Sequence, residues 1–187
     1  MPIMPARVSA KAALACLFAA LACVGAYIAL PLPISPAPLV LSNLFAILGG
    51  LLLGPAWGSL SVLLYLAIGA LGFPVFSGGR GGLAHLAGPT GGYLVGYLAG
   101  ALLAGFIARK RGLLRSALGS VLGFASILAI GATALKLFNG LSWGKAIAVG
   151  VLPFMIGDGI KAALSAIVAS KLGAFTDSLI GESVDRG

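Results

Sequence analysis

Charged residues are scarce in this sequence of 187 residues. They make up 9% of the chain, whereas hydrophobic residues make up 60%. An ordinary soluble domain has about a quarter charged residues. This excludes an ordinary soluble protein and predicts a polytopic membrane protein embedded in a lipid bilayer. The net charge is +8, but the basic residues do not gather on one soluble face, so we expect no nucleic-acid partner.

Residue types that carry out catalysis are also few: one histidine, two cysteines and four acidic residues. A membrane metalloprotease needs an HExxH pair and an intramembrane aspartyl protease needs two aspartates. Neither set is present, and the one histidine, His85, falls in a loop. The glycine run GGRGG lacks the GK[ST] ending of a phosphate-binding loop. We therefore expect no enzyme, no catalytic residue, no metal site and no cofactor, and any coupling to ATP must come from a partner.

Six apolar segments divide the chain. They cover about residues 12–30, 39–58, 56–71, 88–108, 116–137 and 146–172. They predict an all-α fold, with six transmembrane helices in one bundle that forms a single domain over 1–187. Gly54 and Pro55 separate the second and third segments, and Pro153 predicts a kink in the sixth. The intervening loops are rich in proline (31–38) and glycine (72–93).

The distribution of basic residues predicts the orientation. With six spans, both termini share a side with eight basic residues, and the opposite side has three, Arg80, Lys136 and Lys145. The positive-inside rule then places both termini in the cytoplasm. The proline loop, the glycine loop and the turn at 139–145 are expected to face outward together. The eight are Arg7, Lys11, Arg109, Lys110, Arg111, Arg115, Lys171 and Arg186.

The segment GDGIK places Asp158 and Lys161 inside the last apolar segment. The other acidic residues fall near the C-terminus, so Asp158 is interpreted as the only carboxylate in the hydrophobic body. It lies about 12 residues into the last span, roughly 18 Å along a helix, which is near mid-membrane. The two side chains share a helix face and either neutralise each other or bind a small polar ligand. In the second case Lys161 suits a carboxylate and Asp158 suits N–H donors.

Other polar groups are expected around the same cavity. Asn43 begins the second segment, and Arg80 and Tyr93 belong to the glycine-rich region. The glycine loop, which includes Gly79, allows backbone N–H groups to approach a ligand. We predict that these residues and the Asp158–Lys161 pair form one binding site.

The first apolar segment has small residues at intervals of four. One row contains Ala15, Ala19 and Cys23, and the row beside it contains Ala12, Cys16 and Ala20. Such rows let two helices approach closely. They either pack within the bundle or dock on a separate membrane subunit.

Three blocks, YLAIGALGFPVFSGGRGG, LAGPTGGYL and PFMIGDGIKA, together resemble the BioY family, the biotin-specific S components of energy-coupling factor vitamin transporters. The resemblance implies a six-helix protein of the bacterial cytoplasmic membrane that binds biotin from outside. It also implies a transmembrane T component and two ATPase subunits as partners, although some members act without them. An S component for another vitamin and an autonomous secondary carrier are the alternatives.

The resemblance also implies roles for individual residues. Asp158 would accept hydrogen bonds from the ureido N–H groups of biotin, and Asn43 matches a polar position of the family. Lys161 is favoured over Arg80 for the biotin carboxylate. Arg80 departs from the family pattern, which has a smaller or amide residue there. Ala15 and Ala19 resemble the surface that docks on the T component.

Overall fold

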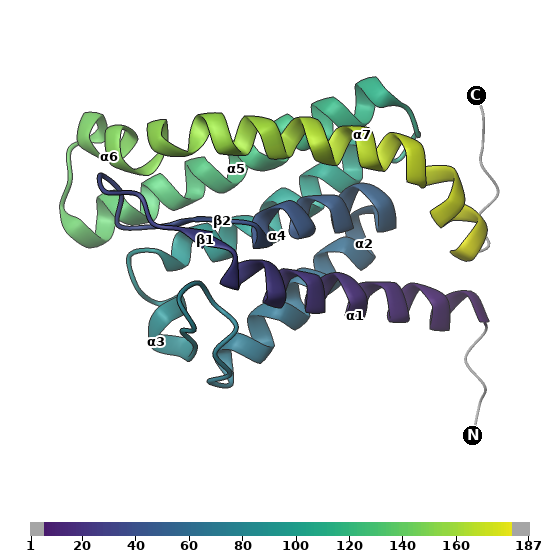
Figure 1. The fold of residues 1–187 in the computed structure, drawn as a ribbon, viewed down its shortest axis with the longest axis horizontal. Helices are drawn as coiled ribbons and strands as arrows, with labels where there is room; N and C mark the ends of the chain where they lie inside the picture. Colours follow the sequence, from purple (N-terminus) through teal and green to yellow (C-terminus); the bar gives the residue numbers. More distant parts are fainter. Residues whose placement is uncertain (1–5, 181–187) are drawn as a thin grey trace.

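The computed structural model describes residues 6–180, and these are mostly helical. The long helices run lengthwise through the molecule and pack side by side (Figure 1). They are α1 (Ala6–Tyr27), α2 (Ser42–Ala70), α4 (Gly91–Ile107), α5 (Leu113–Asn139) and α7 (Met155–Ile180). Shorter elements connect them: the strands β1 (Ala29–Leu30) and β2 (Leu39–Val40), the helices α3 (Leu83–Leu86) and α6 (Trp143–Gly150), and a 3-10 turn at Leu152–Phe154.

Several helices are long and apolar enough to cross a bilayer. Within the described residues there are four such segments, Arg7–Tyr27, Ser42–Ala70, Leu113–Asn139 and Trp143–Ile180. Helix α4 is also apolar but has only 17 residues. The structure therefore agrees with the prediction of a helical membrane protein.

Helix α2 is two helices joined by a sharp reversal. The backbone at Gly54 has φ 78° and ψ 178°, which is not helical and is open to glycine at little cost. A Cβ on Gly58 would lie 2.4 Å from the Cα of Gly50. Residues eight apart on one continuous helix are about 12 Å apart, so the chain turns back on itself here. The predicted separation at Gly54 and Pro55 is therefore present.

Glycines hold α4 against α5. A Cβ on Gly96 would lie 2.9 Å from the Cα of Ile127, and one on Gly100 would lie 2.9 Å from the carbonyl oxygen of Gly123. The two backbones are so close that a side chain would not fit between them. Gly96 and Gly100 therefore lie on the face of α4 that packs against α5.

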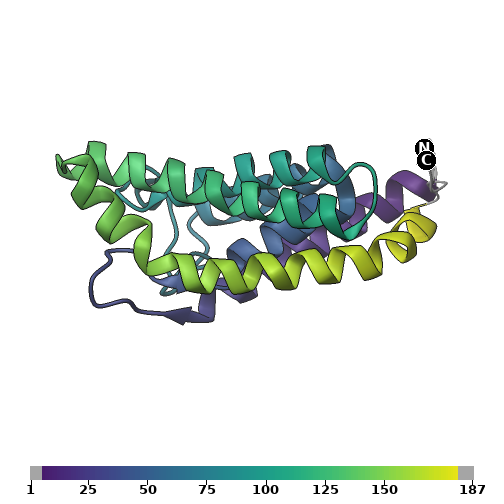
Figure 2. The ribbon, with the colours of Figure 1, turned by 90° about the horizontal axis from the view of Figure 1, so that it is seen from above.

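The last apolar segment is broken at the predicted proline. Helix α6 ends at Gly150, the 3-10 turn contains Pro153, and α7 begins at Met155. Seen from above, α6 runs obliquely and α7 extends along most of the molecule (Figure 2). The predicted helix rise of roughly 18 Å before Asp158 is therefore wrong, because the segment breaks at Pro153 and Asp158 belongs to the first turn of α7.

A second buried carboxylate corrects another prediction. Asp177 lies in the last turns of α7, is 5% exposed and forms an ion pair with Arg111. The guanidinium of Arg111 also donates to the carbonyl oxygens of Leu51, at 2.6 Å, and Leu52, at 2.9 Å. Asp158 is thus not the only carboxylate in the hydrophobic body. Glu182, Asp185 and Arg186 lie outside the described residues.

The row of small residues assigned to partner docking faces inward. Ala15 is 0% exposed and Ala19 is 3% exposed, and α1 packs mainly against α2. These side chains fill the space between two helices of the same chain, so the prediction that they form a docking surface is wrong for this structure. The neighbouring row faces outward, with Cys16 and Ala20 exposed and Ala12 partly exposed.

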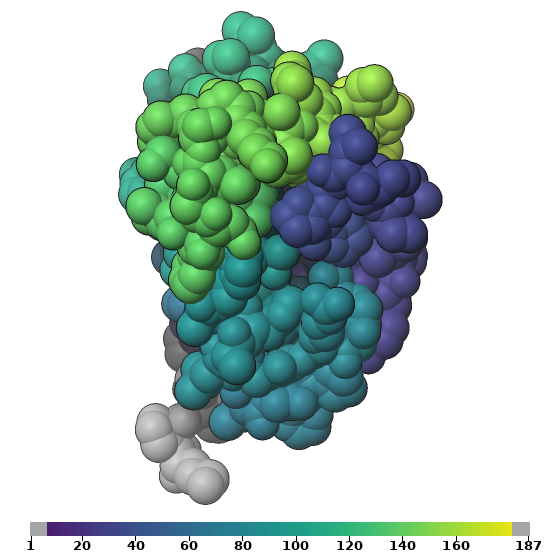
Figure 3. Space-filling model, turned by 90° about the vertical axis from the view of Figure 1, so that its left-hand side faces the viewer, coloured from purple at the N-terminus to yellow at the C-terminus, as the bar shows by residue number. Residues whose placement is uncertain are grey.

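The three predicted loops meet at one end of the molecule. The first residues of α1 and the last turns of α7 lie at the other end (Figure 1). The proline loop follows α1 and forms a small hairpin closed by β1 and β2, which pair antiparallel. Figure 3 shows the proline loop, the glycine loop and the region of α6 around a hollow at this end.

Candidate binding site

Three polar side chains form a buried network between α2 and α7. Asn43 Nδ2 donates to Asp158 Oδ1 at 3.1 Å, and Lys161 Nζ lies 2.5 Å from the same oxygen. Lys161 Nζ also donates to Asn43 Oδ1 at 2.7 Å. Asp158 is 3% exposed and Lys161 is 5% exposed. Buried ions are stable when they are paired and hydrogen-bonded in this way.

Lys161 is fully engaged inside this network. Its third acceptor is the backbone oxygen of Val40, at 2.9 Å, and an ammonium group has three N–H donors. The ammonium also lies 5.6 Å from the ring centre of Phe124, close enough for a cation–π contact. All three donors of Lys161 thus have partners within the protein, and its assignment to the biotin carboxylate stays a prediction.

Asp158 keeps one oxygen for another partner. The contacts of its carboxylate with Asn43 and Lys161 both use Oδ1, and within residues 6–180 Oδ2 has no hydrogen bond. The residue lies in the first turn of α7, where the helix dipole favours a negative charge. Asp158 thus has one carboxylate oxygen available as an acceptor.

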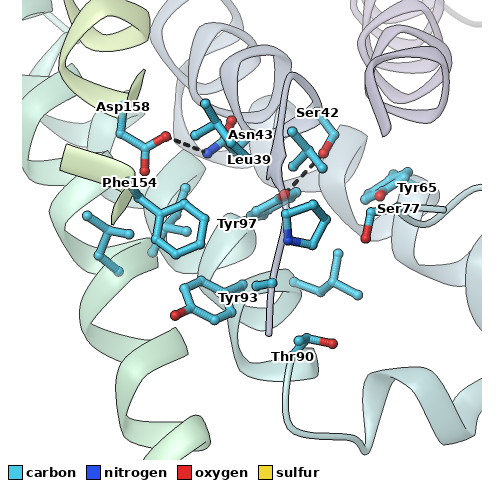
Figure 4. A pocket seen from close by; sticks show the side chains of 16 residues that line it. Leu39, Ser42, Asn43, Tyr65, Ser77, Thr90, Tyr93, Tyr97, Phe154 and Asp158 are labelled. Atoms are coloured by element: carbon cyan, nitrogen blue, oxygen red, sulfur yellow. Dashed lines mark hydrogen bonds between the residues drawn. The ribbon is translucent and has the colours of Figure 1, made fainter. Parts of the chain in front are cut away.

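Asp158 and Asn43 border an inner cavity of about 50 Å³, which has room for about three to five water molecules. Its walls come from the end of the proline loop, the glycine loop, both halves of α2, the first turns of α4, the middle of α5 and the region where α7 begins. Aromatic rings make up much of the lining, namely Tyr93, Tyr97 and Phe154 (Figure 4). The cavity therefore combines a charged acceptor with apolar, flat walls.

An outer cavity of about 500 Å³ lies between the three loops. Thr90 borders both cavities, so they adjoin. Arg80 and His85 line the outer one, and the His85 ring stacks on Phe76 with ring centres 5.5 Å apart. Partial burial, and then the charge of Arg80, lower the pKa of His85 below its usual value. At neutral pH the outer cavity is thus bordered by one cation, Arg80, and a neutral imidazole.

Comparison with known proteins identifies the family. A model of the BioY family matches residues 4–177. The chain belongs to the BioY family. A probable biotin transporter BioY from Pyrococcus horikoshii is 45% identical over 162 residues, which cover 87% of this chain and 95% of the relative. The biotin transporter BioY of Thermotoga maritima is 40% identical over 83% of this chain and 91% of its own length.

A solved structure shows the same fold. The crystal structure of the S component for biotin from an ECF-type ABC transporter superposes with a TM-score of 0.83 and 27% sequence identity. The match covers 91% of this chain and 94% of the other. The BioY family consists of transporter components and not of enzymes, which agrees with the catalytic inventory of the sequence.

The residues predicted for the site of this BioY chain do not all lie together. Asn43, Asp158 and Tyr93 border the inner cavity. Tyr93 contributes its ring, because its hydroxyl donates to Gly150 O at 2.6 Å. Lys161 lies behind Asp158 and Asn43, and Arg80 lines the outer cavity. Gly79 is exposed in the turn beside Arg80, with φ 68°, and borders neither of these two cavities.

Sequence reasoning missed part of the lining of the inner cavity. Tyr65, Tyr97 and Phe154 sit within apolar segments, where an aromatic residue gives no signal of a ligand. Ser42 was visible as a polar residue near the start of a span, and its hydroxyl pairs with the Tyr97 hydroxyl at 3.0 Å. No cluster of three or more His, Cys, Asp or Glu side chains that suits a metal ion occurs in the described part of the BioY chain.

Proposed function

We propose that this chain binds biotin in the inner cavity and takes part in its uptake across the cytoplasmic membrane. The observation that carries the proposal is Asp158, a buried carboxylate paired with Lys161, with one oxygen free at an aromatic-walled cavity. Such a group needs N–H donors to compensate for its removal from water. The ureido ring of biotin supplies two of them, and the names of the relatives point to the same ligand.

The arrangement of the cavity suggests how biotin lies in it. The ureido N–H groups would donate to Asp158 Oδ2, while Asn43 and Lys161 hold the carboxylate in place. The thiophane ring would lie against Tyr97, Tyr93 and Phe154. The acid end would then point toward the glycine loop, where Arg80 offers a positive charge at the adjoining cavity. Binding in this pose requires the two cavities to open toward each other, because the inner one is small.

We propose the membrane topology from the same elements. Helix α1, the two halves of α2, helix α4, helix α5 and the α6–α7 segment would form six spans of one membrane domain covering 1–187. Both termini would face the cytoplasm of a bacterium, and the three loops around the outer cavity would face outward. The basic residues near the chain ends and between α4 and α5 support this orientation through the positive-inside rule.

We propose that the chain works as the S component of an energy-coupling factor transporter. The solved structure with the same fold is an S component of an ECF-type ABC transporter, and this sequence has no ATP-binding motif of its own. A transmembrane T component and two ATPase subunits would then supply the energy. On α1 the outward row Ala12, Cys16 and Ala20 offers a close-packing surface for such a partner.

Equilibrium binding of radiolabelled biotin to the purified chain tests the proposal. Thiamine, riboflavin and desthiobiotin serve as competitors. We expect biotin to displace the label at the lowest concentration, and thiamine and riboflavin to leave it bound. Displacement by thiamine or riboflavin instead would favour an S component for another vitamin. Uptake by vesicles that contain only this chain would favour an autonomous carrier.

A further inference from the structure

The hydroxyl of Tyr65 is buried without a hydrogen-bond partner. Tyr65 lies in the second half of α2 and is 1% exposed, and among residues 6–180 its hydroxyl oxygen has no partner. The ring is fixed on two sides. Phe76 packs edge-on with ring centres 5.5 Å apart, and Tyr97 stacks on it at 6.3 Å. The side chain therefore cannot turn outward to reach water, and its unpaired hydroxyl destabilises the protein unless something else binds it.

This hydroxyl belongs to the inner cavity. Tyr65, Ser42, Ser77 and Tyr97 all border that cavity, and in Figure 4 Tyr65 and Ser77 lie on the side away from Asp158. Ser42 and Tyr97 pair with each other through their 3.0 Å contact, and Tyr93 donates to Gly150 O. Tyr65 is therefore the tyrosine of this cavity, within residues 6–180, whose buried hydroxyl has no hydrogen bond. Ser59 is also buried and unpaired, but it borders neither of the two cavities.

The two sides of the cavity have opposite hydrogen-bonding character. Asp158 is an acceptor that needs N–H donors, whereas the Tyr65 hydroxyl is a donor that needs an acceptor. A ligand that fits both sides has N–H groups at one end and an acceptor group at the other. Biotin has this pattern, with two ureido N–H groups at one end and a carboxylate at the other. In Figure 4 Asp158 and Tyr65 lie on opposite sides of the cavity, as the ureido ring and the carboxylate lie at opposite ends of biotin.

We propose that the Tyr65 hydroxyl donates a hydrogen bond to the carboxylate of bound biotin, and so selects for ligands that end in an acid. This inference rests on the proposed function. It adds a second contact at the acid end: Arg80 would supply charge from the outer cavity, and Tyr65 a directed hydrogen bond from inside. Because Phe76 and Tyr97 hold the phenol ring, the donor is in place before the ligand arrives.

The test uses the substitution Tyr65→Phe, which removes the hydroxyl oxygen and keeps the ring. Affinities are measured for biotin and for an analogue whose side chain ends in a methyl group. We expect the variant to bind biotin about 2- to 10-fold more weakly, the range of one hydrogen bond, and to bind the analogue as the parent does. The matched control, Ser59→Ala, removes the other unpaired hydroxyl and should change neither affinity. The ligand-free Tyr65→Phe protein should unfold at no lower temperature than the parent.

Each other outcome overturns the proposal. If the variant binds biotin as tightly as the parent, the hydroxyl contacts no ligand and holds at most a water molecule. If both ligands lose affinity equally, the hydroxyl contacts the ring system and not the acid end. If the parent itself binds no biotin, the proposed function fails, and this result is distinct from the other two.

Discussion

At the scale of single residues, the site depends on how a lysine and an aspartate remain stable away from water. Each of the two charged groups has partners in the folded chain: Lys161 has Asp158, Asn43 and a backbone oxygen, and Asp158 has Asn43 and Lys161. This network uses all the donors of the lysine and leaves one oxygen of the aspartate. In our account Asp158 contacts the ligand, while Asn43 and Lys161 position it.

Asp158→Asn should weaken biotin binding by roughly 10- to 150-fold. The reason is the loss of charge-assisted hydrogen bonds, which are worth about 1.5–3 kcal/mol. Titration of the purified variant with labelled biotin measures the effect. Asp177→Asn is the matched control, because Asp177 is equally buried but lies at the other end of α7. Biotin binding at parental affinity by the Asp158 variant would show that Asp158 has only a structural role.

Arg80→Ala and Lys161→Met should differ in how they respond to the ligand charge. We expect Arg80→Ala to weaken binding of biotin more than binding of biotin amide, which has no negative charge. We expect Lys161→Met to weaken both by similar factors, because it removes the group that orients Asp158 and Asn43. The affinities of the two variants for biotin and for biotin amide decide which cation contacts the carboxylate. If the Lys161 variant loses affinity for biotin only, the carboxylate contacts Lys161 and not Arg80.

The residues of the site were only partly visible in the sequence. Asp158, Lys161 and Asn43 stand out because polar side chains are rare in apolar segments, and the structure brings the three together. Tyr65 and Phe154 do not stand out, because the same residues occur in any helix core. The role of Asp177 was misjudged for a different reason. Its burial depends on Arg111, 66 positions earlier in the chain, and no local pattern reveals that contact.

At the scale of elements, Arg111 connects three parts of the fold. It lies between α4 and α5, pairs with Asp177 of α7 and donates to the last carbonyl groups before the reversal in α2. Carbonyl groups at a helix end lack partners within the helix, and a guanidinium satisfies two of them here. The same two elements, α2 and α7, carry Asn43 and Asp158 toward their other ends.

Arg111→Ala should lower the stability of the protein by about 3 kcal/mol. We take the lower end of the range for breaking a buried ion pair, because the Arg111 side chain is 23% exposed. The thermal unfolding midpoint in detergent measures the loss. Lys110→Ala, a change at the exposed neighbour, should leave the midpoint unchanged. A midpoint for Arg111→Ala equal to that of the parent would mean that the contacts with Asp177 and α2 contribute little.

Large residues on the two faces of α1 should have different effects. Ala20→Trp lies on the outward face and should spare biotin binding while preventing assembly with a T component. Ala19→Trp lies inside the bundle and should reduce the yield of folded protein. Co-purification with a T component and biotin titration of the same samples give both readouts. If the Ala20→Trp variant assembles normally with the T component, the docking surface lies on another helix.

The positions of the helices could largely be predicted from the sequence, but the directions in which the helices run could not. Apolar runs, Gly54 and Pro153 indicated where helices occur and where they break. The sequence did not indicate that α6 runs obliquely and that α7 starts near Asp158, because the angle after a proline depends on what the next helix packs against. The inward and outward rows of α1 could not be distinguished either, since both consist of small residues.

At the scale of the whole molecule, the residues of the proposed site lie at one end, around two adjoining cavities. Residues from the proline loop, the glycine loop and the turn after α5 line the outer cavity together, as the predicted topology required. The helices below form a closely packed body in which glycines bring α4 against α5. A rigid body with the site and three loops at one end suits a protein that admits its ligand from that side.

The most direct measurement of the central claim is a structure of the chain with biotin bound. The account predicts the ligand in the inner cavity, with a ureido nitrogen about 2.7–3.2 Å from Asp158 Oδ2 and the acid end toward Tyr65 and Arg80. Lys161 should keep its contacts with Asp158 and Asn43. Biotin confined to the outer cavity, or bound with its carboxylate on Lys161, would contradict the account.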